Sequence, residues 1–362
     1  AVLLIDATTS WNAYLTDELR VLSGKYSRAL SGTPQAMDKK KAAFYLAQGP
    51  YNQALGLWYA GEKFSPEAKA DVEAKVATMI DVYKSRLQTA DWLAPETREK
   101  AITKLNVITP HIGYPEKLPE TYDKKIIDEN LSLVENAQKL VEISIAHSWS
   151  KWNKPVDRSE WHMPAHMVNA YYDPQQNQIV FPAAILQAPF YDIAQSSSAN
   201  YGGIGAVIAH EISHAFDTNG ASFDENGSLK NWWTEDDYAA FKERTDKIVD
   251  QFEGLDSYGA KVNGKLTVSE NVADLGGVAC ALEAAKRDED FSVREFFINF
   301  ATIWRTKARE EYMQMLASVD VHAPAKWRTN VIVTNFDEFH KEFDVKEGDG
   351  MWRAPEDRVI IW

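Results

Sequence analysis

Hydrophobic and polar positions follow a helical period over the first part of the chain, from residue 10 to about residue 151. A proline and a glutamate follow both Ser65 and Ala94, as they do in the first turn of many helices. The stretch 111–119 contains a glycine and two prolines and predicts a loop, and a further helix is expected from about 129 to 152. Breaks between helices are expected at residues 31–34, at Gly61, at 65–66 and at 94–95.

The period of the pattern changes to two beyond Pro155. Two alternating runs, 167–172 and 178–181, flank turn-forming residues and predict a β-hairpin whose second strand ends at Pro182. The pattern therefore predicts a mainly α protein of the α+β class with one small sheet, divided into a helical region, 1–154, and a second region, 155–362. Later helices are expected at about 234–252, 269–286, 292–315 and 335–343.

Length, charge and cysteine content narrow the possible functions. The chain has 362 residues, which favours two domains or two lobes, and its net charge of −14 argues against nucleic acid as a partner. No apolar run approaches the roughly 18 residues of a membrane span. The first residues lack a methionine and a basic segment, so they predict no signal peptide and suggest a chain entered partway. Cys280 is the only cysteine, which favours a cytoplasmic location and leaves secretion open.

Residues 210–214 read His-Glu-Ile-Ser-His, a pattern that indicates a zinc-dependent peptidase. Positions i and i+4 share one face of a helix, so His210 and His214 can both bind one Zn²⁺ at about 2.0 to 2.1 Å. Glu211 then lies beside the metal, where its carboxylate can take a proton from zinc-bound water. The motif predicts a metal, a nucleophile and a base; a chance match is the alternative.

A catalytic zinc needs a third protein ligand, and Glu270 is the candidate. Asp274 lies one helical turn after Glu270 and could accept a hydrogen bond from the ring N–H of a zinc histidine, which fixes the tautomer, a role that Asp217 could share. Ser269 is expected to cap this helix. Alternatively, the two acids simply oppose the helix dipole. The glycines at 276 and 277 favour the zinc site, because glycines inside a helix usually mark close packing.

With these motifs, the chain resembles the C-terminal part of the neprilysin family of zinc endopeptidases, and most of all its bacterial oligopeptidases. The resemblance implies a thermolysin-like catalytic domain over 155–362 and part of a helical capping domain before it. It also implies one Zn²⁺ per chain, with the ligands and the base named above and with Asp274 orienting a zinc histidine. The resemblance rests on five runs, which are 168–172, 177–187, 200–217, 269–277 and 358–362.

The resemblance adds two groups near the C-terminus and a peptide-binding strand. It implies that His322 stabilises the oxyanion of the reaction and that Arg328 binds a substrate carbonyl. Asn169 and Ala170 match a strand on which an extended peptide pairs with the protein backbone. Ala206 stands where some relatives carry a larger side chain, so the pocket is expected to be roomier. The residues expected to form the pocket for the residue after the scissile bond, each equally compatible with an ordinary core, are Ile185, Phe190, Val207 and Trp304.

The expected function is hydrolysis of oligopeptides on the amino side of hydrophobic residues, by water that zinc binds and Glu211 activates. Members of the family are much longer than this chain, and the part that is absent here completes their helical lobe. The N-terminal part of the same protein is therefore an expected partner. The alternative is a C-terminal fragment that binds zinc and peptide but needs that missing part for turnover.

Overall fold

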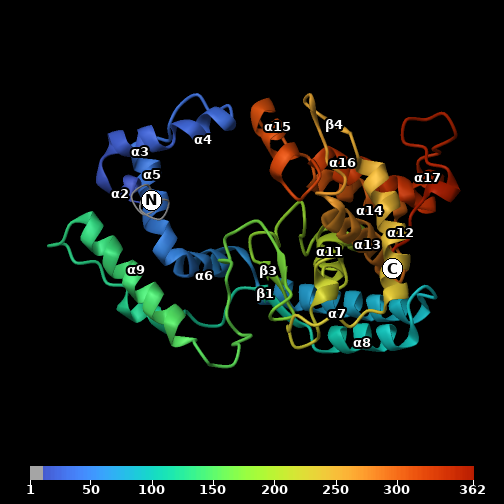
Figure 1. The fold of residues 1–362 in the computed structure, drawn as a ribbon, viewed down its shortest axis with the longest axis horizontal. Coiled ribbons are helices and arrows are strands. Elements are labelled where there is room, and N and C mark those ends of the chain that lie inside the picture. The colour runs from blue at the N-terminus through green and yellow to red at the C-terminus, as the bar shows by residue number, and fades with distance from the viewer. Residues whose placement is uncertain (1–10) are drawn as a thin grey trace.

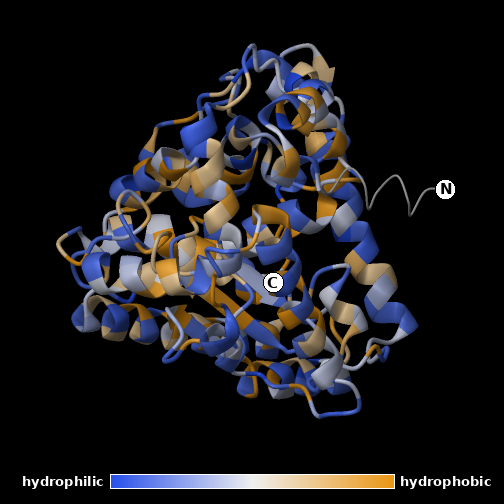
Figure 2. Cartoon of the chain, turned by 90° about the vertical axis from the view of Figure 1, so that its left-hand side faces the viewer, coloured by the Kyte–Doolittle hydropathy of each residue, from blue (hydrophilic) through white to orange (hydrophobic). Residues whose placement is uncertain are grey.

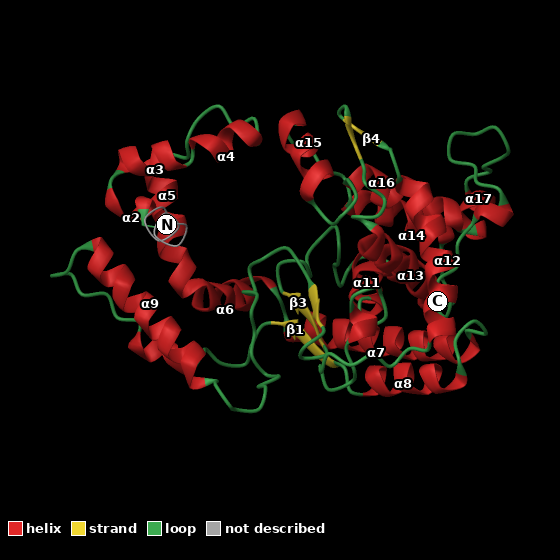
Figure 3. Cartoon of the chain, viewed as in Figure 1, coloured by secondary structure: helices red, strands yellow, loops and turns green. Residues whose placement is uncertain are grey.

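The computed structural model describes residues 11–362. The predictions about the start of the chain, including the absence of a signal peptide, fall on residues 1–10 and lie outside the described residues. None of the helices in the described part of the chain is long and apolar enough to cross a bilayer. Helices dominate the structure, and the few strands are short (Figure 3).

One group of helices from the first part of the chain lies on the left of Figure 1. The longest of them, α9, begins with a capping box in which Ser132 and Glu135 bond each other's backbone N–H groups. The predicted break at Gly61 is wrong, because α6 runs through it; a single helical glycine costs only about 1 kcal/mol. The group comprises α2 (Asn12–Leu15), α3 (Asp17–Ser23), α4 (Lys25–Leu30), α5 (Lys39–Gln48), α6 (Asn52–Lys63) and α9 (Leu133–Ser150).

Two further helices of the first part of the chain pack beneath the C-terminal region instead (Figure 1). They are α7 (Pro66–Thr89) and α8 (Pro95–Asn106), and both begin at the predicted prolines. The hydroxyl of Tyr83 on α7 donates to the carbonyl of Ala209 at 2.7 Å. The predicted helical region therefore reaches the elements that carry the candidate site, and a domain boundary near residue 155 stays a prediction.

A three-stranded sheet lies between these helices, in the order β1-β3-β2. The predicted hairpin forms from β2 (Tyr171–Asp173) and β3 (Gln178–Pro182). Its first strand is shorter than predicted, because residues 167–170 have no ladder partner within the described residues. The predicted loop 111–119 is partly wrong, since β1 (Thr109–Gly113) pairs in parallel with β3. This pairing joins segments distant in sequence, which a local pattern cannot reveal.

The remaining helices belong to the second part of the chain. The predicted helix 292–315 is wrong as one element, because it breaks at Trp304, whose ring stacks on Arg328. The helices are α10 (Ser197–Asn200), α11 (Ala206–Ser213), α12 (Glu235–Phe252), α13 (Val268–Ala285), α14 (Val293–Ile303), α15 (Glu310–Val319), α16 (Ala325–Asn330) and α17 (Asp337–Glu342). A short hairpin adds β4 (Asp256–Ser257) and β5 (Ala260–Lys261).

The core centres on α11 and α13, which form the largest interface between two helices. Their backbones approach closely at Gly277, where an added Cβ would lie 2.8 Å from the nitrogen of His210. The side chain of Trp362 fills the space beside Gly276, and its indole N–H donates to Ser213 at 2.8 Å. Most helices carry hydrophobic and hydrophilic residues together, as expected of helices with one buried face (Figure 2).

Asp237 joins α12 to the junction of α7 and α8, although it is 1% exposed and no cation pairs with it among the described residues. Its carboxylate accepts hydrogen bonds from the hydroxyl of Thr97 at 2.6 Å and the backbone N–H of Ala94 at 2.7 Å. It also accepts from the backbone N–H and the hydroxyl of Thr234, at 3.1 and 2.6 Å. Burial raises the pKa of Asp237, but these hydrogen bonds outweigh it and hold the pKa below 3.8.

Replacing Asp237 by Asn should lower the free energy of unfolding by about 2 to 3 kcal/mol, because an amide N–H₂ would face a backbone N–H. The wild-type contribution is present above the unfolded pKa and is lost as the pH falls through the lower folded pKa. Urea denaturation at pH 7 and at acid pH measures both effects. The exposed Asp236→Asn in the same turn is the control, and equal stability of the two variants would contradict the assignment.

Candidate active site

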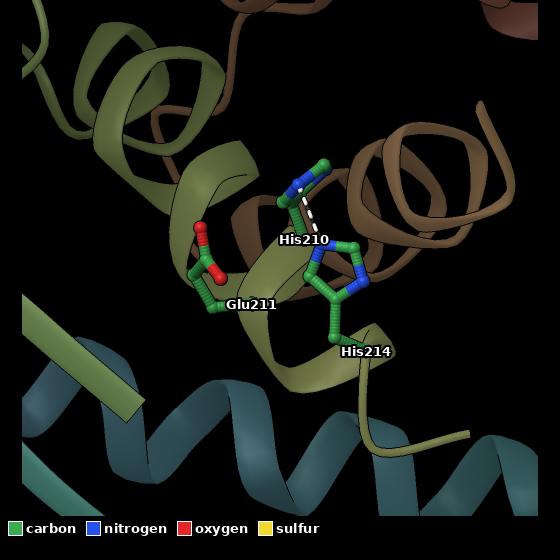
Figure 4. Close-up of side chains that lie close together, drawn as sticks. All are labelled: His210, Glu211 and His214. Carbon is green, nitrogen blue, oxygen red and sulfur yellow. Dashed lines mark hydrogen bonds between the residues drawn. The ribbon is translucent and has the colours of Figure 1, made fainter. Parts of the chain in front are cut away.

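The site begins at a helix that the chain enters through one glycine-rich turn of π-helix, Tyr201–Gly205, which is wider than an α-helical turn. This turn leads directly into α11, whose surface is almost wholly buried. His210 and His214 lie on one face of the helix, as their spacing of four residues predicts. Figure 4 shows their two imidazoles close together, with the Glu211 carboxylate to one side.

Three side-chain atoms converge at this point. The Nε2 atoms of His210 and His214 lie 3.0 Å apart, and Oε2 of Glu270 lies 3.3 and 3.6 Å from them. Ligand atoms bound tetrahedrally at about 2.0 to 2.1 Å from zinc would be separated by about 3.3 to 3.4 Å. Oε2 of Glu270 is also buried without a hydrogen-bond partner among the described residues. The three residues therefore fit a zinc ion.

The opposite ring nitrogens of both histidines face carboxylates. Nδ1 of His210 lies 2.8 Å from Asp274, and Nδ1 of His214 lies 2.7 Å from Asp217. A proton on Nδ1 of His214 completes a hydrogen bond to Asp217, and a proton on Nδ1 of His210 faces the Asp274 carboxylate. Both Nε2 atoms then keep lone pairs that can bind a metal and cannot hydrogen-bond each other. Such carboxylate–histidine pairs orient metal ligands in many zinc proteins, so this arrangement also fits zinc.

The electrostatic balance of the site favours a cation. Burial lowers the pKa of His210, but the carboxylates of Asp274 and Glu270 outweigh it and raise the pKa. The pKa of His214 is raised well above its ordinary value against burial, by Asp217 and Glu270. Burial raises the pKa of Glu270, yet the neighbouring imidazoles outweigh it and lower that pKa. Carboxylates thus attract positive charge to the buried point where the three side chains meet.

Glu211 is the other carboxylate near the two histidines, and ligand atoms of all three residues lie within 4.8 Å of one another. It has neither a hydrogen bond nor an ion pair within residues 11–362, whereas Glu270 lies between both Nε2 atoms. Burial raises the pKa of Glu211, and the two imidazoles oppose that rise. Glu270 is therefore the better third ligand, and Glu211 is free to exchange a proton.

His322 reaches the same centre from the loop before α16. Its Nε2 lies 3.1 Å from Oε2 of Glu270, and its Nδ1 lies 2.8 Å from Asp320. The contact with Glu270 raises the pKa of His322, while burial opposes the rise. The ring is half-exposed, with 44% of the side chain accessible, so His322 can meet a substrate.

Arg328 on α16 is buried and forms a paired contact with Asp274. Its Nε and Nη2 both donate to the carboxylate of Asp274 at 2.7 Å, which leaves Nη1 without a hydrogen-bond partner in the described part of the chain. The guanidinium also stacks on the ring of Trp304 at 3.9 Å. Asp274 thus links Arg328 to His210, a connection that the sequence did not reveal.

A cavity of about 510 Å³ opens above these groups. Asn169 and Ala170 line it directly before β2, which has a free side because it pairs with β3 alone within residues 11–362. Every site residue expected from the sequence lines this one cavity. They are Asn169, Ala170, Ile185, Phe190, Val207, His210, Glu211, His214, Asp217, Glu270, Asp274, Trp304, His322 and Arg328.

Two residues contact the expected site residues in roles that the sequence analysis did not predict. Asp320 accepts from the backbone N–H of His322 at 2.9 Å and faces its ring; its position two residues before the histidine was a usable signal. Ser269 was expected to cap α13, and this is wrong, because Thr267 precedes the helix. The Ser269 hydroxyl instead donates to Asp217 at 2.5 Å.

Comparison with known proteins is consistent with this geometry. The family model described as Peptidase family M13 matches residues 169–359, and a second model with the same description matches residues 1–115. The first match covers more than half of the chain. The chain belongs to peptidase family M13. The expected membership of the neprilysin family and the expected fold, mainly helical and thermolysin-like with a small sheet, are thereby confirmed.

Several relatives of this M13 chain carry peptidase names. A Streptococcus gordonii protein named as a zinc metalloproteinase is 77% identical over 296 residues, covering 82% of this chain and 52% of its own length. The neutral endopeptidase of Lactococcus lactis subsp. lactis is 52% identical over 350 residues, covering 97% of this chain and 56% of its own. The chain thus spans about half the length of these relatives.

Solved structures of bacterial proteins show the same fold. The crystal structure of PEPO from Lactobacillus rhamnosis has a TM-score of 0.93 at 42% identity, covering 98% of this chain and 56% of that one. The Mycobacterium tuberculosis zinc metalloprotease ZMP1, in complex with an inhibitor, has a TM-score of 0.88 at 36% identity over the same shares. At these identities the likeness supports a zinc peptidase scaffold.

Changing Glu270 to Gln in this M13 chain should weaken zinc binding by more than about 100-fold, because a charged ligand is replaced by a neutral one. Glu211→Gln is the matched comparison and should leave the zinc affinity within a few-fold of wild type. Competition with a chromogenic chelator measures both dissociation constants. If Glu211→Gln caused the larger loss, Glu211 would be the ligand and the assignment of Glu270 would be wrong.

Proposed function

We propose that the chain is the catalytic part of a zinc-dependent endopeptidase that hydrolyses oligopeptides on the amino side of hydrophobic residues. The observation that carries the proposal is the convergence of three ligand atoms beside an unpaired, buried Glu211. Held by His210, His214 and Glu270, one Zn²⁺ per chain would polarise the scissile carbonyl and acidify a water molecule. The names of the relatives support a peptidase over the alternative of a fragment that binds peptide without turnover.

The chain's own residues bind and orient the peptide. The free edge beside Asn169 and Ala170 suits an extended peptide, whose backbone groups can pair there whatever its sequence. Nη1 of Arg328 is available to donate to a substrate carbonyl, while the other two guanidinium contacts fix its direction. A peptide bound in this way would have its scissile bond near Glu211 and His322, because both line the same cavity.

Glu211 and His322 handle the proton and the negative charge. The Glu211 carboxylate takes a proton from water as the water oxygen attacks the carbonyl carbon, and later delivers it to the leaving nitrogen as the C–N bond breaks. The raised pKa of His322 favours its protonated form, which can donate to the developing oxyanion. Asp320 holds the ring in position for this contact. The products are a new carboxylate and a new amine.

Changing Glu211 to Gln should lower kcat/KM by about 10³-fold or more, because the amide cannot accept the proton. Zinc should stay bound at one per chain, measured by elemental analysis of the purified variant. The activity assay uses a fluorogenic oligopeptide with an internal Phe or Leu. Wild-type rates in the variant would contradict the proposed base, and peptidase activity that persists after zinc removal would contradict the zinc mechanism.

The apolar residues that line the cavity include a small one, Ala206, which we assign to the pocket for the residue after the scissile bond. We expect Ala206→Leu to reduce kcat/KM for peptides with Phe after the scissile bond about 10-fold relative to peptides with Ala, because the added methylenes fill the pocket. The exposed Ala301→Leu on α14 is the control. An unchanged ratio of the two kcat/KM values would show that Ala206 does not contact this side chain.

The cytoplasmic location and the association with an N-terminal part of the same protein stay predictions. Several large apolar side chains on the helices of the first group are exposed, among them Tyr26 at 76% and Trp149 at 69%. Exposed apolar surface of this kind suits a protein partner. Peptidase assays with and without a separately produced N-terminal polypeptide of a relative would measure whether this chain needs one for turnover.

A further inference from the structure

Lys104 is a buried cation in a region that the mechanism does not use. It lies on α8 with 1% of its surface exposed, and it forms no ion pair within the described residues. Its ammonium instead donates to three backbone carbonyls, those of Ala215 at 2.9 Å, Gly220 at 2.8 Å and Phe223 at 2.7 Å. The three acceptors match the three donors of an ammonium group.

All three carbonyls belong to one segment, 215–223, which directly follows His214. This segment carries Asp217, which faces Nδ1 of His214 at 2.7 Å. The other carboxylate oxygen of Asp217 accepts from the backbone N–H groups of Asn219 and Gly220, at 2.8 and 2.7 Å. Lys104 and Asp217 therefore fix the same short turn, one through its carbonyls and the other through its N–H groups.

A buried charge at position 104 is costly unless it has a specific role. Burial lowers the pKa of Lys104 to about 7, and the carboxylates of Asp217, Asp224 and Glu225 oppose that fall. A methionine would fill a similar volume without the cost of desolvating an ammonium group. The three carbonyls that accept hydrogen bonds from the ammonium group belong to the turn that presents Asp217, so the charge serves to hold this turn.

We propose that Lys104 is a positioning residue of the zinc site, which acts by fixing the 215–223 turn so that Asp217 orients His214. A residue of the predicted helical region then helps to set the metal affinity of the catalytic region. The inference rests on the proposed zinc site, and wild-type zinc binding tests that site separately. Failure of the wild type to bind zinc would overturn the proposed function, whereas the variants below test Lys104.

The test measures zinc dissociation constants by chelator competition in a double-mutant cycle of Lys104→Met and Asp217→Asn. Removing a group that orients a zinc ligand weakens metal binding by about 10- to 100-fold. We expect about 10-fold weaker binding for each variant and little further loss in the double variant, because both act through one contact. The exposed Lys100→Met on the same helix is the control and should bind zinc like the wild type.

Two further measurements separate positioning from general stability. The absorption spectrum of the cobalt-substituted protein should shift in Lys104→Met and return toward wild type in Lys104→Arg, which keeps a cation with several donors. If Lys104→Met does not fold, Lys104→Gln takes its place in the cycle. Wild-type zinc affinity in the Lys104 variant, or losses that add fully to those of Asp217→Asn, would overturn the proposal.

Discussion

The close approach of α11 and α13 is the constraint on which the rest of the structure depends. Gly277 removes the side chain that would collide with the backbone at His210, so the two helices can pack almost backbone to backbone. This spacing brings Glu270 and Asp274 to opposite nitrogens of the His210 ring. A wider spacing would separate the ligand atoms and leave several buried charges without partners, at a cost of several kcal/mol.

The first part of the chain supports this helix pair from below. Tyr83 on α7 bonds the carbonyl of Ala209, and Lys104 on α8 holds the turn after His214. The zinc helix is therefore fixed at its middle and just beyond its C-terminal end by helices that precede the sheet in sequence. His322 and Arg328 line the cavity from elements near the C-terminus. Rigid support of the zinc helix beside an open cavity suits a site that must hold a metal and admit a peptide.

Sequence reasoning succeeded where the signal is local. Each of the successful patterns concerns residues close together in sequence. They are the two histidines four residues apart, the acids one turn apart on α13, and the alternating runs around a turn. It failed where the decisive partner is distant. The strand β1 exists because β3 lies beside it, and the helix breaks at Trp304 where the ring stacks on Arg328. The pairing of Arg328 with Asp274 likewise joins residues 54 positions apart. Resemblance to a family placed His322 and Arg328, which local pattern alone could not.

The central claim is that His210, His214 and Glu270 bind one zinc ion while Glu211 stays free. A crystal structure of the zinc-loaded chain, with anomalous diffraction recorded on both sides of the zinc edge, tests it most directly. The account predicts one strong anomalous peak bonded to both Nε2 atoms and to the Glu270 carboxylate. A peak bonded to Glu211 in place of Glu270, or no peak at this site in zinc-saturated protein, would contradict the account.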